Sequence, residues 1–581
     1  RYGRAGDDDE RIRGHLIEIN AILDGDGGLS FDIGYCGHAY DAGSIEMLAR
    51  LFEEALRAVT QHCLKAPLSH CYTPSDFPLV SKPQGDRSAL LDQSLLDALL
   101  SGDGDIEDLV PLTPLQQGLV FESMQLGVDV PDPYHTQLVV TLDGALDVEA
   151  LHQSWSSLVD VHPVLRLSPA SGPASTSGSG MIPGLGVIYG SGFYDFKEVV
   201  LKGDREARLS MLRSDDVSDR YCFDGAPLVR VRVGALGGNE TALLLSTHHT
   251  LLDGWSTPLL MSQFIDLYDG YVSGRKGAPV SVYAWQDHIR WLSDQSVSSA
   301  EGYWRDYLCE VIEPCRVASA GISSELDHVD INVALEGSVV AGIDAFARTH
   351  GLTQATVLLG CYALVLGRFG GLDDIVIGNV SSGRTHPVDG IEEALGLFIE
   401  TLPVHYSLSS DACFADWLAA HQVAQSGHGM HGHIGLGAIQ GLVGLSGQAL
   451  FDAVFVYENY PVDIDDDVTM GGLSFTGVDD YDDTHYPIGL VVAPSSEGMS
   501  LRFSYQLGYM DDAVAGVLVE QLTALLGRLG GVGGVPLGGI NTIIPEQEAA
   551  ALLHASGPVV AHDAALLTLP SLFDAQSGKT P

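Results

Sequence analysis

A short strand, a pair of histidines and a helix follow one another directly near the middle of the chain, and this order constrains the fold more than any other feature. Residues 242–247 form an apolar run of the length typical of a buried strand. His248 and His249 follow, and a helix is predicted soon after them, because Ser256 or Thr257 can cap its first turn. A strand that leads through a short loop into a helix indicates an α/β fold. Side chains at such a junction can project into a cleft with fixed geometry.

Helical and strand patterns alternate through the rest of the main body. One helical pattern ends at Gly351, a residue type that commonly terminates helices, and a second covers Thr353–Phe369. Short apolar strands are expected at Asp374–Asn379 and Phe451–Tyr457. The chain is therefore predicted to be an α/β protein of two substantial lobes.

The residues around the paired histidines have the chemistry of a catalytic loop. Histidine suits proton handling because its ordinary pKa lies near neutrality. Asp253 could hold a ring nitrogen or anchor the loop, and the backbone N–H of Gly254 could face a developing oxyanion. Two adjacent histidines are usually not catalytic, however, so this interpretation depends on further motifs elsewhere in the chain.

The chain is too long for one ordinary domain, at 581 residues. Residues 28–59 align without gaps on residues 498–529, and both copies predict a short strand, a turn and an amphipathic helix. We interpret residues 1–65 as the end of an upstream domain related to the main one. Residues 66–105 are rich in proline and have the composition of a linker.

Charge and cysteine spacing argue against several kinds of partner. Acidic residues number 76 against 29 basic ones, a net charge of −47, so neither nucleic acid nor an anionic membrane surface is expected as a partner. The eight cysteines form no C-x-x-C pair and suggest neither a zinc site nor disulfides, which favours a cytoplasmic protein. The histidines within residues 428–433 and the acidic stretches near 465 and 479 are interpreted as polar loops or helix ends, so no metal is predicted.

The string from His248 to Gly254 resembles the H-H-x-x-x-D-G signature of condensation domains of non-ribosomal peptide synthetases. Val161 departs from the family's pattern, which usually has arginine there, and Glu400 stands where asparagine is usual. Other segments resemble further motifs of that family in the expected order: 112–121, 162–166, 283–291, 382–384, 396–403 and 456–461.

The resemblance implies an α/β fold of two chloramphenicol-acetyltransferase-like lobes in a V, with a tunnel between them. A donor peptidyl thioester and an acceptor aminoacyl thioester would enter on the 4'-phosphopantetheine arms of carrier proteins, and the domain itself would bind no cofactor. The acceptor amine would attack the donor carbonyl and form a peptide bond. Such chemistry belongs to the biosynthesis of antibiotics and other secondary metabolites.

The resemblance also assigns roles to individual residues. His249 would be the central group, either as a general base or as a group that only orients the amine. Asp253 is expected to hold the loop, and a carboxylate buried there needs a cationic partner, for which Arg384 is the candidate. The catalytic set is His248, His249, Asp253 and Gly254; the supporting set is Arg166, Trp255, Ser256 and Arg384; the tunnel set is Gln117, Glu400, Tyr457 and Asn459.

The flanking segments suggest part of a larger assembly. Residues 106–280 would form the N-terminal lobe and 281–535 the C-terminal lobe. Residues 1–65 look like the end of an epimerization or condensation domain, and 536–581 look like a linker followed by the start of an adenylation domain. The expected partners are therefore upstream and downstream carrier domains and these adjoining domains.

The segment from Pro111 to Gly118 resembles condensation domains that accept a donor ending in a D-residue. Two alternatives stay open. One is an epimerization domain, which shares the paired histidines and inverts a Cα centre. The other is a catalytically silent module that recruits carrier or tailoring proteins.

Overall fold

A computed structural model of the chain describes residues 15–23, 28–65, 72–81, 89–101, 105–126, 130–171, 181–275, 285–311, 313–317, 328–409, 411–445, 448–459, 469–481, 484–495 and 498–540. The described residues divide into two compact units. The first comprises residues 1–76 and 93–103, and the second comprises residues 77–92 and 104–581. The expected start of an adenylation domain lies outside the described residues.

The first unit is a hairpin with a long helix. β1 and β2 pair antiparallel, with Ile17 opposite Tyr35. The Asp41 side chain begins the helix by accepting the backbone N–H of Ser44 at 3.0 Å. Its elements are β1 (Ile17–Leu23), β2 (Leu29–Tyr35), α1 (Ala42–Lys65), η2 (Pro74–Asp76) and α3 (Gln93–Leu100). The stretch interpreted as a linker therefore contains short helical segments.

The predicted repeat between residues 28–59 and 498–529 is present in the structure. β2 and α1 have their counterparts in β17 (Gly498–Gln506) and α14 (Asp512–Leu526). Asp511 caps α14 as Asp41 caps α1, since it accepts the N–H of Val514 at 2.9 Å. Each copy is preceded by an antiparallel partner strand, β1 in one case and β16 in the other.

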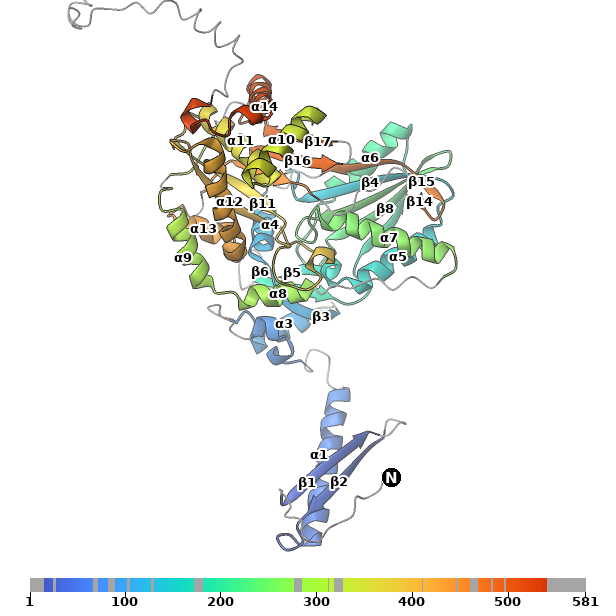
Figure 1. The fold of residues 1–581 in the computed structure, drawn as a ribbon. Helices are drawn as coiled ribbons and strands as arrows, with labels where there is room; N and C mark the ends of the chain where they lie inside the picture. Colours follow the sequence, from blue (N-terminus) through green and yellow to red (C-terminus); the bar gives the residue numbers. More distant parts are fainter. Residues whose placement is uncertain are drawn as a thin grey trace, which may run out of the picture. The chain divides into compact units, whose positions relative to one another are not determined.

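The N-terminal lobe of the second unit is built on a six-stranded sheet, and β7–β8 is its parallel pair. Apolar residues of α5 and α7 pack on this sheet and form one core with it, and Figure 1 shows both helices against the strands β4 and β8. The strands in order are β14 (Thr469–Met470), β15 (Leu473–Tyr481), β4 (His135–Asp143), β9 (Glu240–His248), β8 (Val229–Gly237) and β7 (Asp195–Val199).

A second, three-stranded sheet lies in the same lobe, with β6 between β3 and β5. Its strands are β3 (Ile106–Pro111), β6 (Met181–Tyr189) and β5 (Leu167–Ser171). The helices that accompany both sheets are α2 (Pro78–Ser81), α4 (Pro114–Gln125), α5 (Val148–Val161), η3 (Pro163–Arg166), α6 (Arg205–Ser218), α7 (Ser256–Val272) and α8 (Trp285–Asp294).

The C-terminal lobe has its own six-stranded sheet, in which β13 runs parallel to both β11 and β16. Residues 356–367 of α11 are buried without interruption, as expected for a helix that is apolar on every side. The strands in order are β10 (His328–Leu335), β17, β16 (Ile488–Ser495), β13 (Ala453–Tyr457), β11 (Asp374–Ser381) and β12 (Glu400–Ser407).

The helices of this lobe form one large core with the sheet. The expected helix end is present at Gly351, which has a φ of +67°, a conformation that glycine adopts without strain. The helices are α9 (Val297–Tyr307), α10 (Gly337–His350), α11 (Gln354–Phe369), α12 (Phe414–His431), η5 (Gly432–Ile434), α13 (Leu436–Leu442), α14, η6 (Leu529–Gly531) and η7 (Leu537–Gly539). The short η4 (Ile391–Glu393) instead places Ile391 in the core of the N-terminal lobe.

The two lobes exchange segments. β15 comes from the late part of the chain but pairs with β4 of the N-terminal lobe, where Tyr481 stands opposite Gln137. α8 and residues 391–398 also contribute side chains to the N-terminal core. The expected acidic loop at residues 479–481 is thus part of a strand, because the backbone there completes the sheet.

In the described residues no single helix combines the length and apolarity needed to cross a membrane. α10 and α11 reach that length only as a pair bent by 105°.

Candidate active site

A cavity of about 730 Å³, here called the central cavity, lies between the two large sheets. The N-terminal lobe contributes His249 and Gly254 to its wall, and the C-terminal lobe contributes Tyr457 and Asn459. With Trp255, which lines the same cavity, the structure places five of the predicted site residues around one space.

His249 is held at the end of β9 by two backbone contacts. Its N–H donates to the carbonyl of Tyr134 at 2.8 Å, and its Nδ1 lies 2.8 Å from the carbonyl oxygen of Leu252. A carbonyl oxygen can only accept, so the proton of the neutral ring resides on Nδ1. This tautomer leaves Nε2 as the basic nitrogen of the ring.

His248 was expected in the catalytic set, but the structure encloses it completely. Its Nδ1 contacts the hydroxyl of Thr250 at 2.9 Å, and its Nε2 contacts the hydroxyl of Ser123 at 3.0 Å. Burial lowers the pKa of His248, against the opposing effect of Asp132, whose carboxylate lies 3.7 Å away. Neighbouring residues at a strand end point to opposite faces, so only one histidine of the pair can face the cavity. His248 accordingly does not line the central cavity.

Asp253 forms the expected ion pair with Arg384, at 3.0 Å from its Nη2. Both side chains are buried, with 1% of Asp253 and 3% of Arg384 exposed. The Asp253 carboxylate also accepts the N–H groups of Ser256 and Phe398, each at 2.9 Å. It contacts neither histidine ring by a hydrogen bond among the described residues, so it anchors the loop.

This anchor joins segments far apart in the sequence. Arg384 donates to the carbonyl oxygens of Ile391 at 2.6 Å and Ala394 at 2.8 Å. Ser256 Oγ lies 2.8 Å from the carbonyl of Gly396, which ties the first turn of α7 to the C-terminal half of the chain. Burial lowers the pKa of the Arg384 guanidinium, and the adjacent carboxylate opposes this change.

The start of α7 differs from the expected capping. Ser256 is the first helical residue, and its N–H is accepted by Asp253 rather than by a serine or threonine at the cap. Trp255 precedes the helix, lines the central cavity and donates its indole N–H to the carbonyl of Glu392 at 2.9 Å. The motif's aspartate therefore has a second role as the helix cap.

Gln117 was expected near the tunnel, but it does not line the central cavity. Its side chain is exposed and donates to the carbonyl of Leu112 at 2.8 Å. Its neighbour Gln116 is buried instead and donates to the carbonyl of Thr250 at 2.8 Å. Gln116 also forms a capping box with Thr113, which fixes the face of α4 that turns inward.

Other predicted residues lie as follows. Tyr457 donates its hydroxyl to the side chain of Gln354 at 2.5 Å. Arg166 is buried and forms an ion pair with Glu107, so it supports the lobe away from the central cavity. Glu400 lines a second cavity, not the central one.

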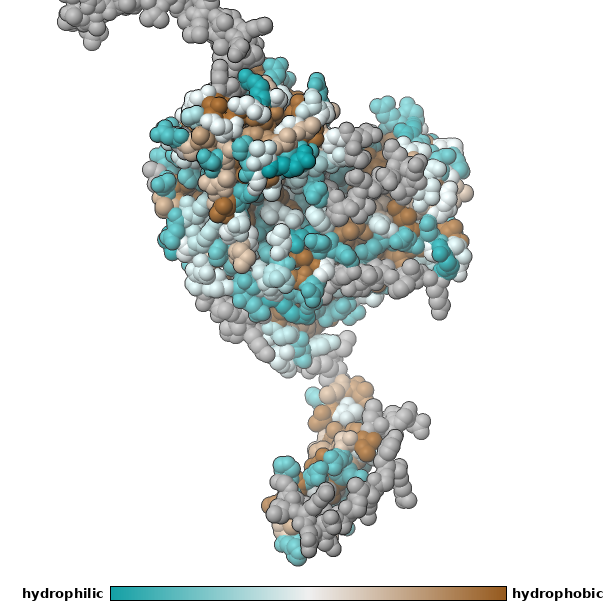
Figure 2. All heavy atoms as spheres, in the orientation of Figure 1, coloured by the Kyte–Doolittle hydropathy of each residue, from teal (hydrophilic) through white to brown (hydrophobic). Residues whose placement is uncertain are grey.

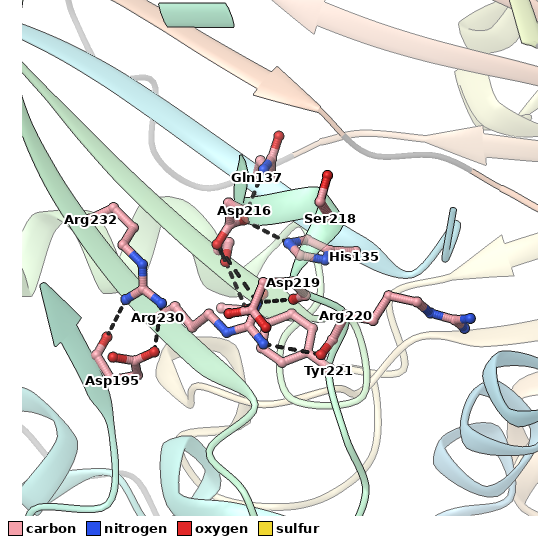
Figure 3. A network of polar contacts seen from close by, with 12 residues as sticks. His135, Gln137, Asp195, Asp216, Ser218, Asp219, Arg220, Tyr221, Arg230 and Arg232 are labelled. Carbon is pink, nitrogen blue, oxygen red and sulfur yellow. Dashed lines mark hydrogen bonds and ion pairs between the residues drawn. The ribbon is translucent and has the colours of Figure 1, made fainter. Parts of the chain in front are cut away.

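A polar network beneath the motif was not predicted from the sequence. Figure 3 shows Asp216 of α6 directed at His135 and Gln137 of β4, with Arg230 on the neighbouring strand β8. The His135 Nε2 lies 2.7 Å from the Asp216 carboxylate, and both side chains are only 2% exposed. His135 stands directly opposite His248 in the sheet. In the sequence, the only signal of this network was the alternation of polar residues along two strands, His135 and Gln137 on β4 and Arg230 and Arg232 on β8.

The comparisons with known proteins agree with this geometry. The family model described as "Condensation domain" matches residues 106–553, well over half of the chain. The chain belongs to the condensation domain family of non-ribosomal peptide synthetases. This family comprises amide-bond-forming domains of the acyltransferase type.

One curated relative of this condensation domain is a linear gramicidin synthase of Brevibacillus parabrevis. It is 31% identical over 529 residues, which cover 89% of this chain but 6% of that protein. The chain therefore spans a small fraction of the length of the curated relative it matches.

Two solved structures share the fold of this condensation domain. The condensation domain from the Monacolin K polyketide synthase MokA is 17% identical, with a TM-score of 0.62 over 74% of this chain and 100% of that one. The X-domain in the complex with OxyB from teicoplanin biosynthesis is also 17% identical, with a TM-score of 0.62 over 75% and 96%. The expected fold of two lobes is thereby confirmed.

Proposed function

We propose that this condensation domain joins two carrier-bound acyl groups by a peptide bond, with His249 beside the reacting amine. The observation that carries the proposal is the position of His249 in a cavity walled by both lobes. Two thioesters held in one space gain a large effective concentration, and this alone supplies much of the rate.

The reaction is an acyl transfer. The lone pair of the acceptor amine attacks the donor carbonyl carbon, a C–N bond forms and the C–S bond breaks. The donor thiolate leaves and takes up one proton, and the amine nitrogen loses one. The Nε2 of His249 accepts the amine hydrogen in the tautomer set by Leu252, and so it orients the lone pair toward the carbonyl.

Gly254 is the proposed donor to the oxyanion. It lines the central cavity together with His249, five residues before it in the chain. A backbone N–H at that place would stabilise negative charge on the carbonyl oxygen. Asp253, by contrast, has its carboxylate occupied by Arg384, Ser256 and Phe398.

We infer further that the donor ends in a D-residue. Two features support this: the Pro111–Gly118 segment resembles domains of that kind, and the first unit has the hairpin–helix of a condensation-type lobe. The upstream and downstream partners would be carrier domains.

The first unit itself supports an upstream neighbour of the same family. α1 exposes large apolar side chains, among them Met47, Leu51 and Val59, each at least 56% exposed, and Figure 2 shows hydrophobic residues on the surface of this unit. Leu48 and Phe52 of α1, 37% and 36% exposed, match Leu518 and Leu522 of α14, which are buried in the core of the C-terminal lobe. We propose that α1 packs in the same way against a lobe that precedes it.

The decisive experiment loads donor and acceptor carriers with defined groups and identifies the product by mass. The unchanged protein should give the condensed peptide, and His249→Ala should lower the rate by about two orders of magnitude or more. His328, on the opposite wall of the same cavity, provides a matched control in His328→Ala. Equal rates for His249→Ala and the wild type would contradict the assignment.

Donor stereochemistry and the alternatives are resolved by the same assay. A donor ending in a D-residue should condense faster than its L-epimer, and the reverse order would contradict the D-donor assignment. Racemised product without a peptide would indicate an epimerization domain. The solved X-domain is in complex with another protein, OxyB, and this likeness makes recruitment the second candidate function. Recruitment without catalysis would be indicated by binding of carriers with no product at all.

A further inference from the structure

A second cavity of about 430 Å³, here called the side pocket, lies next to the central cavity. The two share part of their walls, including Tyr134, Ile399 and Thr401. On β12 and the residue before it, Ile399 and Thr401 reach the central cavity while Glu400 between them lines only the side pocket. A substrate held beside His249 would therefore lie against the wall of the side pocket.

The side pocket is largely apolar. Leu115 and Leu119 of α4 line one part of it, and Leu402, Leu436 and Phe451 line others. Neither lysine nor arginine occurs among the described residues that line it. An aliphatic arm would be well accommodated here, but the pocket supplies no cationic partner for an acid.

Glu400 nevertheless places its carboxyl group in this wall. Its Oε2 is buried and has no hydrogen-bond partner among the described residues. The carboxyl packs over the backbone of Gly432, where an added Cβ would stand 2.8 Å from the carboxyl carbon of Glu400. The carboxyl group therefore fills the space that a side chain at position 432 would occupy.

Ionisation of the Glu400 carboxyl group is unfavourable in this environment. Burial raises the pKa of Glu400 to about 8, so ionisation is suppressed when the pocket is empty. Two histidines that line the pocket do not supply a positive charge, because burial lowers the pKa of His288 to about 3 and that of His485 to about 4. His433 uses its Nε2 to contact the carbonyl of Ser296 at 3.2 Å.

A neutral hydrogen-bonding ligand does not explain a glutamate here. Asparagine or glutamine would hydrogen-bond a hydroxyl or amide equally well, without the cost of burying an acid. A cationic ligand explains it, because a buried carboxylate is stabilised by a charged partner and a charge-assisted hydrogen bond.

We propose that the side pocket admits a basic amino-acid side chain of one substrate, whose aliphatic arm packs against the leucines and whose cationic end pairs with Glu400. This assignment rests on the proposed function, since it concerns a substrate of the same condensation reaction. Glu400 is a specificity-determining residue in this arrangement.

The test is a competition in the carrier-loaded condensation assay. Lysine and norleucine, which have arms of similar length with and without the charge, compete first as the acceptor and then as the terminal donor residue. The wild type should prefer lysine by about 10- to 100-fold in one of the two positions, the range for a hydrogen bond to a charged group. Glu400→Gln should reduce this ratio to about one, and Glu400→Asp should retain part of it.

The control variant is Glu122→Gln, which removes an acid from the same cavity at an exposed position of α4. It should keep the preference for lysine. A wild type that prefers lysine in neither position, or a preference that survives in Glu400→Gln, overturns the assignment. Glutamine is added as a third competitor, and a preference for it over both lysine and norleucine would overturn the assignment and identify a neutral hydrogen-bonding ligand. Peptide formation from norleucine alone would still support the proposed function. A failure of the Glu400 assignment can therefore be distinguished from a failure of the proposed function.

Discussion

Replacing Asp253 by asparagine tests whether the motif's aspartate is an anchor. Oδ2 of Asp253 accepts the N–H of Phe398, while Oδ1 accepts from Arg384 Nη2 and from the N–H of Ser256. An asparagine amide must direct its NH₂ group at one of these donors, so one contact becomes a clash of two donors. The guanidinium of Arg384 also loses its negative partner while it stays buried.

The size of the effect follows from these contacts. Removing one partner of a buried ion pair costs about 3–5 kcal/mol. If the second unit, with roughly 400 described residues, melts as one body, its entropy of unfolding is about 0.8 kcal/mol per kelvin. Asp253→Asn should therefore lower the melting temperature by about 4–6 °C. Because Gly254 and His249 share this loop, peptide formation should fall on the order of 100-fold.

Thermal unfolding followed by circular dichroism measures the first effect, and the carrier-loaded assay measures the second. Asp287→Asn is the matched control, because Asp287 pairs with Arg290 on an exposed face of α8 and should change the melting temperature by less than about 1 °C. The double variant Asp253→Asn/Arg384→Met should lose about 2–3 kcal/mol less than the two single variants together. Strict additivity, or a melting temperature equal to that of the wild type, would refute the anchoring role.

Three further predictions concern burial. Glu400 has its pKa raised on folding from 4.5 to about 8, so its contribution to stability is fully present below about pH 4.5 and is lost as the pH rises to about 8. Over this pH range the free energy of unfolding of the wild type should thus fall by about 4–5 kcal/mol more than that of Glu400→Gln, as measured by urea titrations at each pH. Identical pH dependence in the two proteins would contradict the burial of Glu400. His248→Leu should lower the melting temperature by about 2–4 °C, since it leaves the hydroxyls of Ser123 and Thr250 without the ring; an unchanged melt would show that the ring is not buried there. Removing residues 1–71 should leave the main melting transition within about 1 °C and reduce binding of a hydrophobic dye, because the exposed apolar face of α1 is lost. Unchanged dye binding would contradict the exposure of this apolar face of α1.

Much of the site could be read from the sequence because its residues are consecutive. The strand, both histidines, Asp253 and the helix start occupy one short segment, and hydrogen bonds within it, such as that of His249 with Leu252, contribute to their positions. The pairing of Asp253 with Arg384 was also predictable, because a buried carboxylate needs a cation. The repeat at residues 28–59 was visible because local elements keep their pattern in both copies.

Only the tertiary structure decided which side chains face the cavity. The two histidines are identical in chemistry, and the alternation of the strand buries one and exposes the other. Likewise, α4 directs Gln116 inward and leaves Gln117 exposed, because the position of the Thr113 cap sets which face of the helix points inward. Sequence alone determined the motif, the family resemblance and the alternation of strands and helices, since these depend on neighbouring residues. The side pocket around Glu400, the crossing of β15 and the Asp216 network were decided by contacts between residues hundreds of positions apart or on separate strands, and no local pattern encodes these.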